Sequence, residues 1–134
     1  MHTKQQVLDF LEKNNCNQEL INDVKDGDGY GWIAESYKEH GAEFIELALK
    51  QDKAKSGFDV YWIAKSYVEH GAEFTELALQ HEKAENRYDV SDIAWSYKEH
   101  GTKFTQLALQ QKQAENGEDV YDIAKEMFNQ SKKD

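Results

Sequence analysis

Residues 58–87 read FDVYWIAKSYVEHGAEFTELALQHEKAENR, and residues 88–117 repeat the same unit as YDVSDIAWSYKEHGTKFTQLALQQKQAENG. Residues 28–57, DGYGWIAESYKEHGAEFIELALKQDKAKSG, are a third copy, and residues 118–134, EDVYDIAKEMFNQSKKD, are a half-copy. A period of 30 residues indicates one small supersecondary unit that stacks on copies of itself. Such chains form extended surfaces and seldom a deep pocket.

Each copy predicts two helices. In residues 58–87, Asp59 is a good candidate for the N-cap of the first helix, because its carboxylate can accept free N–H groups of the first turn. The apolar positions of that helix recur at helical spacing, at Val60, Ile63, Ala64 and Tyr67. Gly71 is expected to end it in the left-handed conformation, with His70 beside the negative end of the helix dipole. A second helix is predicted from about residue 72 to 85.

Positions that keep their residue from copy to copy are predicted to form the core. They are Ile33, Ile63, Ile93 and Ile123; Ala34, Ala64, Ala94 and Ala124; Tyr37, Tyr67 and Tyr97; Phe44, Phe74 and Phe104; and Leu47, Leu77 and Leu107. One hairpin could not bury such a face alone, whereas several stacked copies can.

The predicted fold is all-α, a short right-handed α-solenoid of seven to nine helices that forms one domain, residues 1–134. Three stacked hairpins, residues 28–57, 58–87 and 88–117, lie between divergent ends. Residues 1–27 are expected to be an N-terminal cap hairpin, with Val7, Phe10 and Leu11 on one helix and Leu20, Ile21 and Val24 on the other. Residues 118–134 are expected to be a capping helix, in which Met127 and Phe128 either close the stack or form a dimer contact.

The first helix of each copy has a large aliphatic residue, a small one, a tyrosine three residues later and a glycine four after that, as in Ile63-Ala64, Tyr67 and Gly71. Over roughly residues 29–128 this spacing resembles tetratricopeptide and Sel1-like repeats. The chain departs from them in its period of 30 residues instead of about 34, in its lack of a terminal proline and in the register of the second helix. The resemblance implies that the first helices line a concave face that binds a peptide or protein.

Composition limits the class of partner. The chain has 16 Lys+Arg against 26 Asp+Glu, a net charge of -10, and its only arginine is Arg87. A nucleic-acid binder needs clustered cations, so no direct nucleic-acid binding is predicted, whereas an acidic protein favours basic partners. No apolar run resembles a signal peptide or a membrane span, so a cytoplasmic location without membrane contact is expected. Cys16 is the only cysteine, which excludes an internal disulfide and is interpreted as a buried or incidental thiol.

Two groups of residues are candidate metal ligands, and neither is favoured. His40, His70 and His100 recur in register, but metal ligands lie about 2 Å from one ion, whereas packed helices lie about 8–10 Å apart. These histidines are therefore interpreted as helix-end residues. Asp26, Asp28 and Glu35 match ligand positions of a calcium loop, but Val24 occupies the first ligand position. A turn in which Asp28 caps the next helix is preferred, and no cofactor is predicted.

Positions that differ between copies are interpreted as surface positions, where residues can change without disturbing the core. One reads Trp32, Trp62, Asp92 and Asp122, and the position one turn later reads Glu35, Lys65, Trp95 and Lys125. Tryptophan, tyrosine and a few cations form a typical anchor set for a protein partner. The candidate partner-binding residues are Trp32, Tyr61, Trp62, Lys65, Val68, Trp95, Lys98, Tyr121 and Lys125. Trp95 is expected to be the most exposed tryptophan, and the alternative for Trp32 and Trp62 is packing between helices.

The predicted function is therefore a non-catalytic interaction module that binds a peptide or protein along the first-helix face. The alternative is an acidic inhibitor or immunity-type protein that blocks the basic, substrate-binding face of another protein. An enzyme is not predicted, because each candidate histidine is duplicated by the repeat and no nucleophile has a unique context. The sequence does not indicate an oligomeric state.

Overall fold

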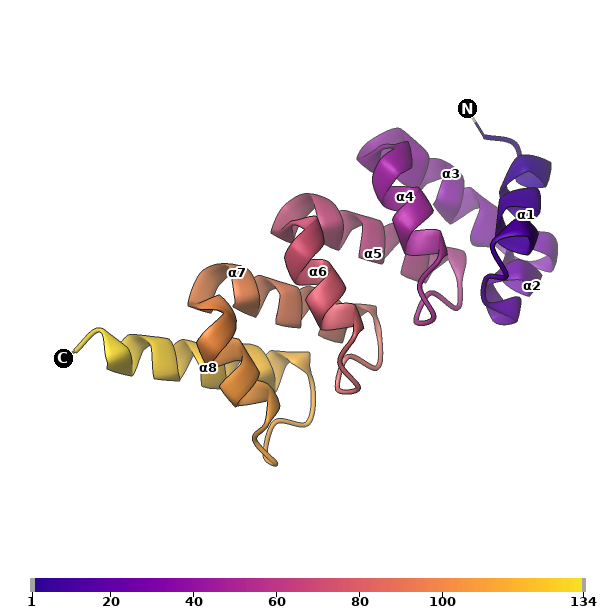
Figure 1. Ribbon diagram of the computed structural model, residues 1–134. Coiled ribbons are helices and arrows are strands. Elements are labelled where there is room, and N and C mark those ends of the chain that lie inside the picture. Colours follow the sequence, from indigo (N-terminus) through magenta and orange to yellow (C-terminus); the bar gives the residue numbers. More distant parts are fainter. Residues whose placement is uncertain (1, 134) are drawn as a thin grey trace. The chain divides into compact units, whose positions relative to one another are not determined.

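The computed structural model describes residues 2–133, and in that range every regular element is an α-helix (Figure 1). The eight helices are α1 Lys4–Lys13, α2 Gln18–Asp26, α3 Gly29–His40, α4 Ala42–Leu49, α5 Gly57–His70, α6 Ala72–Leu79, α7 Arg87–Leu109 and α8 Gly117–Ser131. The prediction of an all-helical fold is confirmed. None of the described helices has both the length and the apolar character that a membrane span requires.

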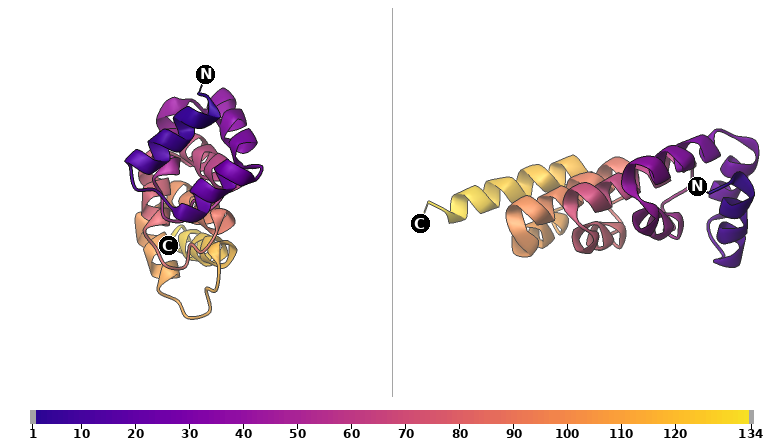
Figure 2. Two further views of the ribbon diagram at one scale, coloured as in Figure 1. Left: turned by 90° about the vertical axis from the view of Figure 1, so that its right-hand side faces the viewer. Right: turned by 90° about the horizontal axis from the view of Figure 1, so that it is seen from above.

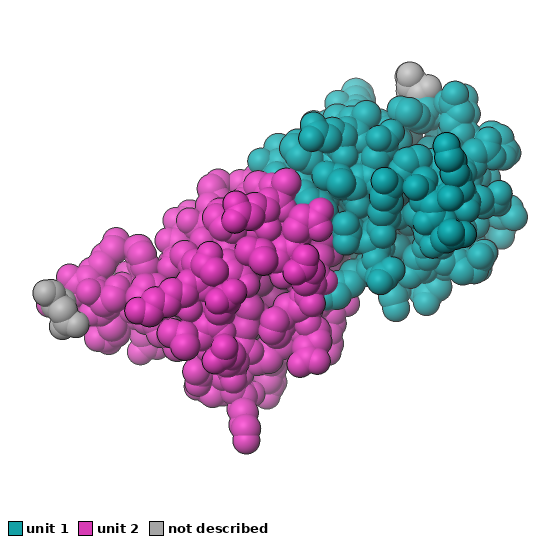
Figure 3. All heavy atoms as spheres, in the orientation of Figure 1, with its two compact units in different colours: residues 1–68 teal, residues 69–134 magenta. Residues whose placement is uncertain are grey.

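The chain divides into two compact units, Met1–Val68 and Glu69–Asp134, with the boundary near the C-terminal end of α5 (Figure 3). Unit 1 contains α1 to α4 and most of α5, and unit 2 contains α6, α7 and α8. Each unit therefore holds a complete copy of the repeat, residues 28–57 in unit 1 and residues 88–117 in unit 2.

The first helix of a repeat begins three residues earlier than predicted. The cap of α7 is Asn86, whose side-chain oxygen accepts the N–H of Asp89 at 3.0 Å, and Asp89 accepts the N–H of Glu85 at 3.1 Å. Asp59 likewise lies inside α5 and accepts the N–H of Lys55 at 3.1 Å. The prediction that Asp59 is the N-cap is wrong, because the Asn or Ser three residues earlier caps the helix and the aspartate bonds back to the chain before it.

A single glycine separates the first helix of a repeat from the second. Gly41, Gly71 and Gly101 have φ of 89°, 94° and 85° with ψ of 151°, 152° and 166°. This is an extended conformation at positive φ that is essentially restricted to glycine, so the predicted left-handed helical conformation is wrong. A Cβ at any of the three would meet nothing within 4 Å. The backbone conformation, and not a lack of space, therefore requires glycine there.

The second helices are shorter than predicted. α6 ends at Leu79, whereas the sequence predicted a helix from about residue 72 to 85. Residues 80–83 are all polar, so a further turn would have no apolar face to bury, and short helices depend on such burial. The chain instead forms a turn in which the Ala84 N–H donates to the His81 carbonyl at 3.1 Å, and Ala84 is fully buried.

The predicted core is largely confirmed on the first helices, where Ala34, Tyr37 and Ile123 are only half-buried, and partly wrong on the second. Ile33, Ile63 and Ile93 are at most 1% exposed. The second helix α6 buries Thr75, Ala78 and Leu79, a set spaced i, i+3, i+4 that forms one face. The predicted leucines and phenylalanines lie beside that face: Leu47, Leu77, Phe44, Phe74 and Phe104 are half-buried and Leu107 is exposed. The leucines two residues later and the loop alanines replace them in the core: Leu49, Leu79, Leu109, Ala54, Ala84 and Ala114.

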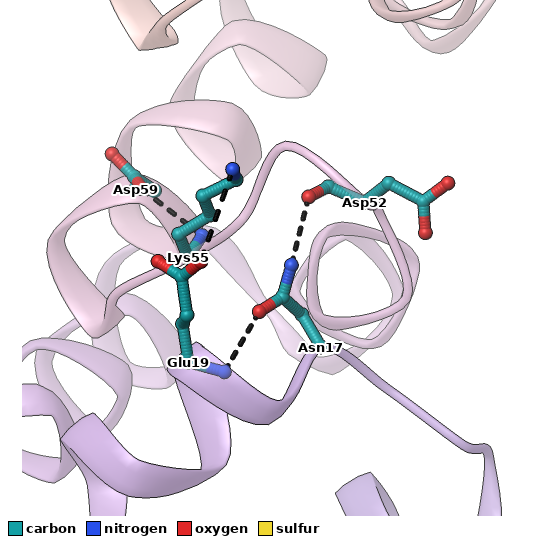
Figure 4. Close-up of polar contacts among 5 residues, drawn as sticks. All are labelled: Asn17, Glu19, Asp52, Lys55 and Asp59. Atoms are coloured by element: carbon teal, nitrogen blue, oxygen red, sulfur yellow. Dashed lines mark hydrogen bonds and ion pairs between the residues drawn. The ribbon is translucent and has the colours of Figure 1, made fainter.

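The N-terminal hairpin consists of α1 and α2, and its predicted apolar residues are buried except Phe10, which is half-buried. Asn17 caps α2, since its side-chain oxygen accepts the Glu19 N–H at 2.8 Å. Its amide nitrogen donates to the Asp52 carbonyl at 3.0 Å (Figure 4). The ammonium of Lys55 lies 4.0 Å from the Glu19 carboxylate. The hairpin is thus bonded to the loop between α4 and α5.

At the C-terminal end of unit 2, α8 is a single helix that packs against α7 (Figure 2). Val120 and Ala124 are fully buried, whereas Ile123, Met127 and Phe128 are half-buried. The predicted amphipathic helix is therefore present, with part of its apolar face open.

Candidate protein-binding surfaces

Five rings of α3 and α5 form the unit 1 aromatic cluster: Trp32, His40, Phe58, Tyr61 and Trp62. The ring centroid of Trp32 lies 4.5 Å from that of Phe58 and 5.4 Å from that of Tyr61. Tyr61 in turn lies 4.9 Å from His40 and 5.9 Å from Trp62. Trp32 is 39% exposed, so the cluster joins two helices and reaches the surface.

Charged groups of both signs border the unit 1 aromatic cluster. The Lys65 ammonium lies 4.5 Å from the ring centroid of Trp62, which is within the range of a cation–π interaction. The Tyr61 hydroxyl donates a hydrogen bond to the Glu39 carboxylate. That bond is the main cause that lowers the pKa of Glu39, because it stabilises the ionised form.

Five rings also form the unit 2 aromatic cluster: His70, Trp95, His100, Tyr121 and Phe128. The ring of Trp95 lies 4.5 Å from that of Tyr121 and 6.3 Å from that of His70, between centroids. Its indole N–H donates to the Glu99 carboxylate at 3.2 Å. Trp95 is nonetheless 41% exposed. One tryptophan is therefore held in place by its neighbours and still exposed to solvent.

The repeated histidines lie at helix ends, as interpreted: His40 and His70 end α3 and α5, and His100 precedes the break at Gly101. They are also packing residues. The ring centroid of His100 lies 4.7 Å from that of Tyr121 and 5.5 Å from that of Phe128, and His100 is 7% exposed. Burial lowers the pKa of both His70 and His100. A neutral imidazole carries no charge to interact with a helix dipole. Its apolar ring contacts explain its place in the fold.

Carboxylates border the unit 2 aromatic cluster where unit 1 has tryptophans. Asp92 and Asp122 occupy the repeat position of Trp32 and Trp62. The pKa of Asp92 is raised, first by burial and then by the negative charges of Glu118, Asp89 and Asp122. The pKa of Tyr121 is also raised, mainly by burial. The two clusters therefore share aromatic character and differ in charge.

The structure brings some of the predicted residues together and leaves others apart. Trp32, Tyr61, Trp62 and Lys65 meet in unit 1, and Trp95 meets Tyr121 in unit 2. The remaining three are surface residues: Val68 at 50% exposure, Lys98, whose ammonium donates to the Glu69 carbonyl at 2.8 Å, and Lys125.

Sequence reasoning missed several members of the two clusters: His40, Phe58, His70, His100 and Phe128. Phe58 could have been found, because its repeat position varies as strongly as that of the tryptophans, reading Asp28, Phe58, Tyr88 and Glu118. The histidines gave no such indication, since they are the same in all three copies.

The calcium-loop residues lie on separate elements. Asp26 ends α2 and Glu35 lies inside α3. No group of three or more His, Cys, Asp or Glu in the described range is arranged to hold a metal ion. Asp28 precedes α3, but its side chain makes no capping hydrogen bond, so the predicted cap is wrong. Its backbone is helical, with φ -84° and ψ 0°, whereas a capping residue normally takes an extended conformation.

Cys16 lies between α1 and α2 and is half-buried. Burial raises the pKa of its thiol, which disfavours the reactive thiolate. This environment is typical of a structural cysteine.

No family model, curated protein or solved structure matches the chain. The resemblance to tetratricopeptide and Sel1-like repeats therefore stays a prediction from residue spacing.

Proposed function

We propose that the protein is a non-catalytic module that binds a peptide or protein segment through the first-helix surface, with Trp95 as the main anchor. The observation that carries the proposal is that the Trp95 side chain is both exposed and held by its neighbours. It is 41% exposed, yet Tyr121 packs against its ring at 4.5 Å and Glu99 accepts its indole N–H at 3.2 Å.

A tryptophan held in this way suits binding for two physical reasons. Its large ring has much apolar surface to bury, and tryptophan is enriched among the residues that dominate binding energy. Because its neighbours already restrict its rotamer, association costs little further side-chain entropy. Trp32 offers a second anchor in unit 1, with Tyr61 and Phe58 behind it.

The proposal includes a tandem-repeat architecture, because equivalent ring pairs recur in the two units. His40 and Tyr61 lie 4.9 Å apart at 60° in unit 1, and His100 and Tyr121 lie 4.7 Å apart at 58° in unit 2. We extend this recurrence to the whole chain as a right-handed α-solenoid, a single domain with divergent ends at residues 1–27 and 118–134. The tetratricopeptide resemblance and a cytoplasmic location belong to the same proposal.

Charge indicates which partners fit the unit 2 surface. Glu118, Asp89 and Asp122 lie close enough for their negative charges to act on Asp92, and the whole chain has a net charge of -10. A segment with an apolar residue for Trp95 and basic residues beside it would complement both features.

The same carboxylates favour a second candidate function, an acidic inhibitor that covers the basic, substrate-binding face of another protein. The two functions differ in their response to salt. Attraction between exposed charges is screened as ionic strength rises, whereas the burial of a tryptophan persists. Binding that disappears in added salt would favour the inhibitor.

The test is capture of partners from native lysate with the wild-type chain, Trp95→Ala and Leu107→Ala in parallel. Leu107 is a matched control, because it is 39% exposed but lies on the second helix of its repeat. The proposal predicts one partner that Leu107→Ala retains and Trp95→Ala loses, with a loss of affinity of about 30-fold or 2 kcal/mol. Circular dichroism first establishes that all three proteins are equally helical. A partner retained by both variants would contradict the proposal.

A further inference from the structure

The C-terminal part of unit 2 has an open groove of about 690 Å³ between residues 102–109 of α7 and α8. Its apolar lining consists of Phe104 and Leu107 from α7 and Ile123 and Met127 from α8. Leu107 is 39% exposed, and the other three are half-buried. We call this groove, with its apolar and polar lining, the C-terminal groove.

One repeat earlier, the counterparts of two groove residues are covered. Ile93 and Tyr97 correspond to Ile123 and Met127, and they are 0% and 4% exposed. Beyond the break at Gly101, α7 continues as the second helix of that repeat and packs on the first through a buried hydroxyl pair. No helix in the described part of the chain takes the corresponding place over α8. The groove is therefore a helix-packing surface without its helix.

Polar residues of the groove carry both signs of charge. Glu126 occupies the repeat position of the fully buried Ser96 and is exposed on the groove wall. Lys103 and Lys133 line the same groove. A carboxylate beside the apolar residues and ammonium groups around them can complement an identical surface turned to face them.

The balance of charge along the chain favours contact between two copies at this end. Residues 103–134 contain five lysines and six acidic residues, a net charge of -1, whereas residues 1–102 contain 11 basic and 20 acidic residues, a net charge of -9. Like charge on two copies opposes their association. That opposition is smallest where the C-terminal grooves face each other.

We propose that two copies of the chain associate through the C-terminal groove in a two-fold symmetric contact. Symmetric association uses the same patch on both copies, so each residue pair occurs twice. Phe104, Leu107, Ile123 and Met127 of one copy cover those of the second copy. Glu126 of each copy faces Lys103 of the second copy.

Sedimentation velocity over a range of protein concentrations tests this association. The wild-type chain is expected to shift from 15.5 kDa to about twice that mass as its concentration rises. Leu107→Glu places a charge in the groove and is expected to weaken association at least tenfold. Trp95→Ala, which changes the unit 2 aromatic cluster instead, is expected to leave association unchanged. A wild-type chain that stays monomeric, or a dimer that Leu107→Glu does not weaken, would overturn the proposal.

Charge reversal tests the pairing without burying a charge among apolar residues. Glu126→Lys and Lys103→Glu each place like charges opposite one another in a symmetric dimer, and each alone is expected to weaken association. A mixture of the two variants restores both opposite-charge pairs and is expected to associate more tightly than either alone. Both substituted residues are exposed, so the helical fold is expected to persist. Failure of the mixture to recover would contradict the assigned pairing.

Discussion

In both units a carboxylate accepts the backbone N–H of the glycine that begins a first helix, but the carboxylate comes from a different part of the chain. In unit 2, the Gly117 N–H donates to Asp89 at 2.8 Å, and both residues belong to the copy of the repeat at residues 88–117. In unit 1, the Gly57 N–H donates at 2.8 Å to Asp23 of α2. The residue that corresponds to Asp89 in unit 1 is Gly29, which has no carboxylate to offer.

The difference shows how a divergent end can replace a repeat contact. A Cβ at Gly29 would lie 2.4 Å from the Asp23 carboxylate oxygen, so glycine makes room for the carboxylate that arrives from α2. The first helical N–H groups need acceptors, but any neighbouring element can supply one. The N-terminal hairpin therefore supplies a hydrogen bond of the repeat and does more than cover its apolar end.

The two aromatic clusters differ in the type of residue that occupies the same position of the repeat. Unit 1 has Trp32 and Trp62 where unit 2 has Asp92 and Asp122. Unit 2 has Trp95 one turn later instead. The buried Ile33 and Ile93 recur in both units, whereas these surface positions differ.

The largest effect is expected from adding a methyl group at the helix starts. A Cβ at Gly57 would lie 2.1 Å from the Gly29 carbonyl oxygen, and one at Gly117 would lie 2.6 Å from the Asp89 Cα. Because backbone must move in both cases, Gly57→Ala and Gly117→Ala are each expected to lower the free energy of unfolding by about 3 kcal/mol. Urea denaturation followed by circular dichroism measures this.

Gly31→Ala is the control for these two variants. Gly31 lies in α3, and its added Cβ would meet nothing within 4 Å. Alanine in a helix interior is more stable than glycine by about 0.5–1 kcal/mol, so this variant is expected to be stabilised. Equal destabilisation by all three substitutions would show that the close approach at Gly57 and Gly117 is not the cause.

The next largest effect on stability is expected from removing the carboxylates of Asp89 and Asp23. Asp89 is 6% exposed and accepts the N–H groups of Gly117 and Glu85, whereas Asp23 is half-buried. Asp89→Ala is expected to lower the free energy of unfolding by about 2 kcal/mol, because buried donors lose a charged acceptor. Asp23→Ala is expected to cost about 1 kcal/mol. No loss of stability in Asp23→Ala would contradict the account that the N-terminal hairpin supplies a hydrogen bond to the repeat.

A smaller effect distinguishes two buried serines. Ser96 Oγ lies 2.8 Å from Thr105 Oγ1 in unit 2. Ser36 Oγ, its counterpart in unit 1, is buried with no hydrogen-bond partner in the described range, and Ile45 replaces the threonine. Ser96→Ala is expected to cost about 1 kcal/mol, whereas Ser36→Ala removes an unsatisfied hydroxyl and is expected to be neutral or stabilising. Equal losses in thermal denaturation would argue against the comparison.

The smallest effect is a dependence of stability on pH that arises in unit 2. Burial holds the pKa of His70 and His100 below the ordinary 6.5, so the unfolded chain binds protons first as pH falls. Their contribution is therefore complete above pH 6.5 and is lost progressively below it. His100→Phe keeps an aromatic ring and is expected to reduce the loss of melting temperature between about pH 7.5 and about pH 5. An unchanged loss in this variant would contradict the assignment to His100.

The sequence predicted the first helices well and the second helices poorly. Ile63, Ala64 and Tyr67 recur at helical spacing, and their burial follows directly from it. The end of α6 at Leu79 could not be read in the same way, because the fully buried Ala84 continues the apolar spacing of a longer helix. Only packing against the rest of unit 2 shows that this alanine lies in a turn. The cap of α5 was ambiguous, since Ser56 and Asp59 are both good caps.

The candidate surface was predictable in part, because it depends on variation between copies. Comparison of the copies pointed to Trp32, Trp62 and Trp95. It could not show which rings meet, and it did not indicate that His100 is buried at its helix end. The burial of His100 depends on Tyr121 and Phe128, which come from the next copy along the chain. Contacts between copies are tertiary, so a local spacing rule does not contain them.

The most direct test of the account is a calorimetric titration of the captured partner against Trp95→Ala and Trp32→Ala. Both tryptophans are exposed to a similar extent, 41% and 39%, so the pair compares the two surfaces on equal terms. The account predicts a loss of affinity of about 30-fold for Trp95→Ala and a smaller loss for Trp32→Ala. Full affinity in Trp95→Ala would contradict the central claim that this tryptophan anchors the partner.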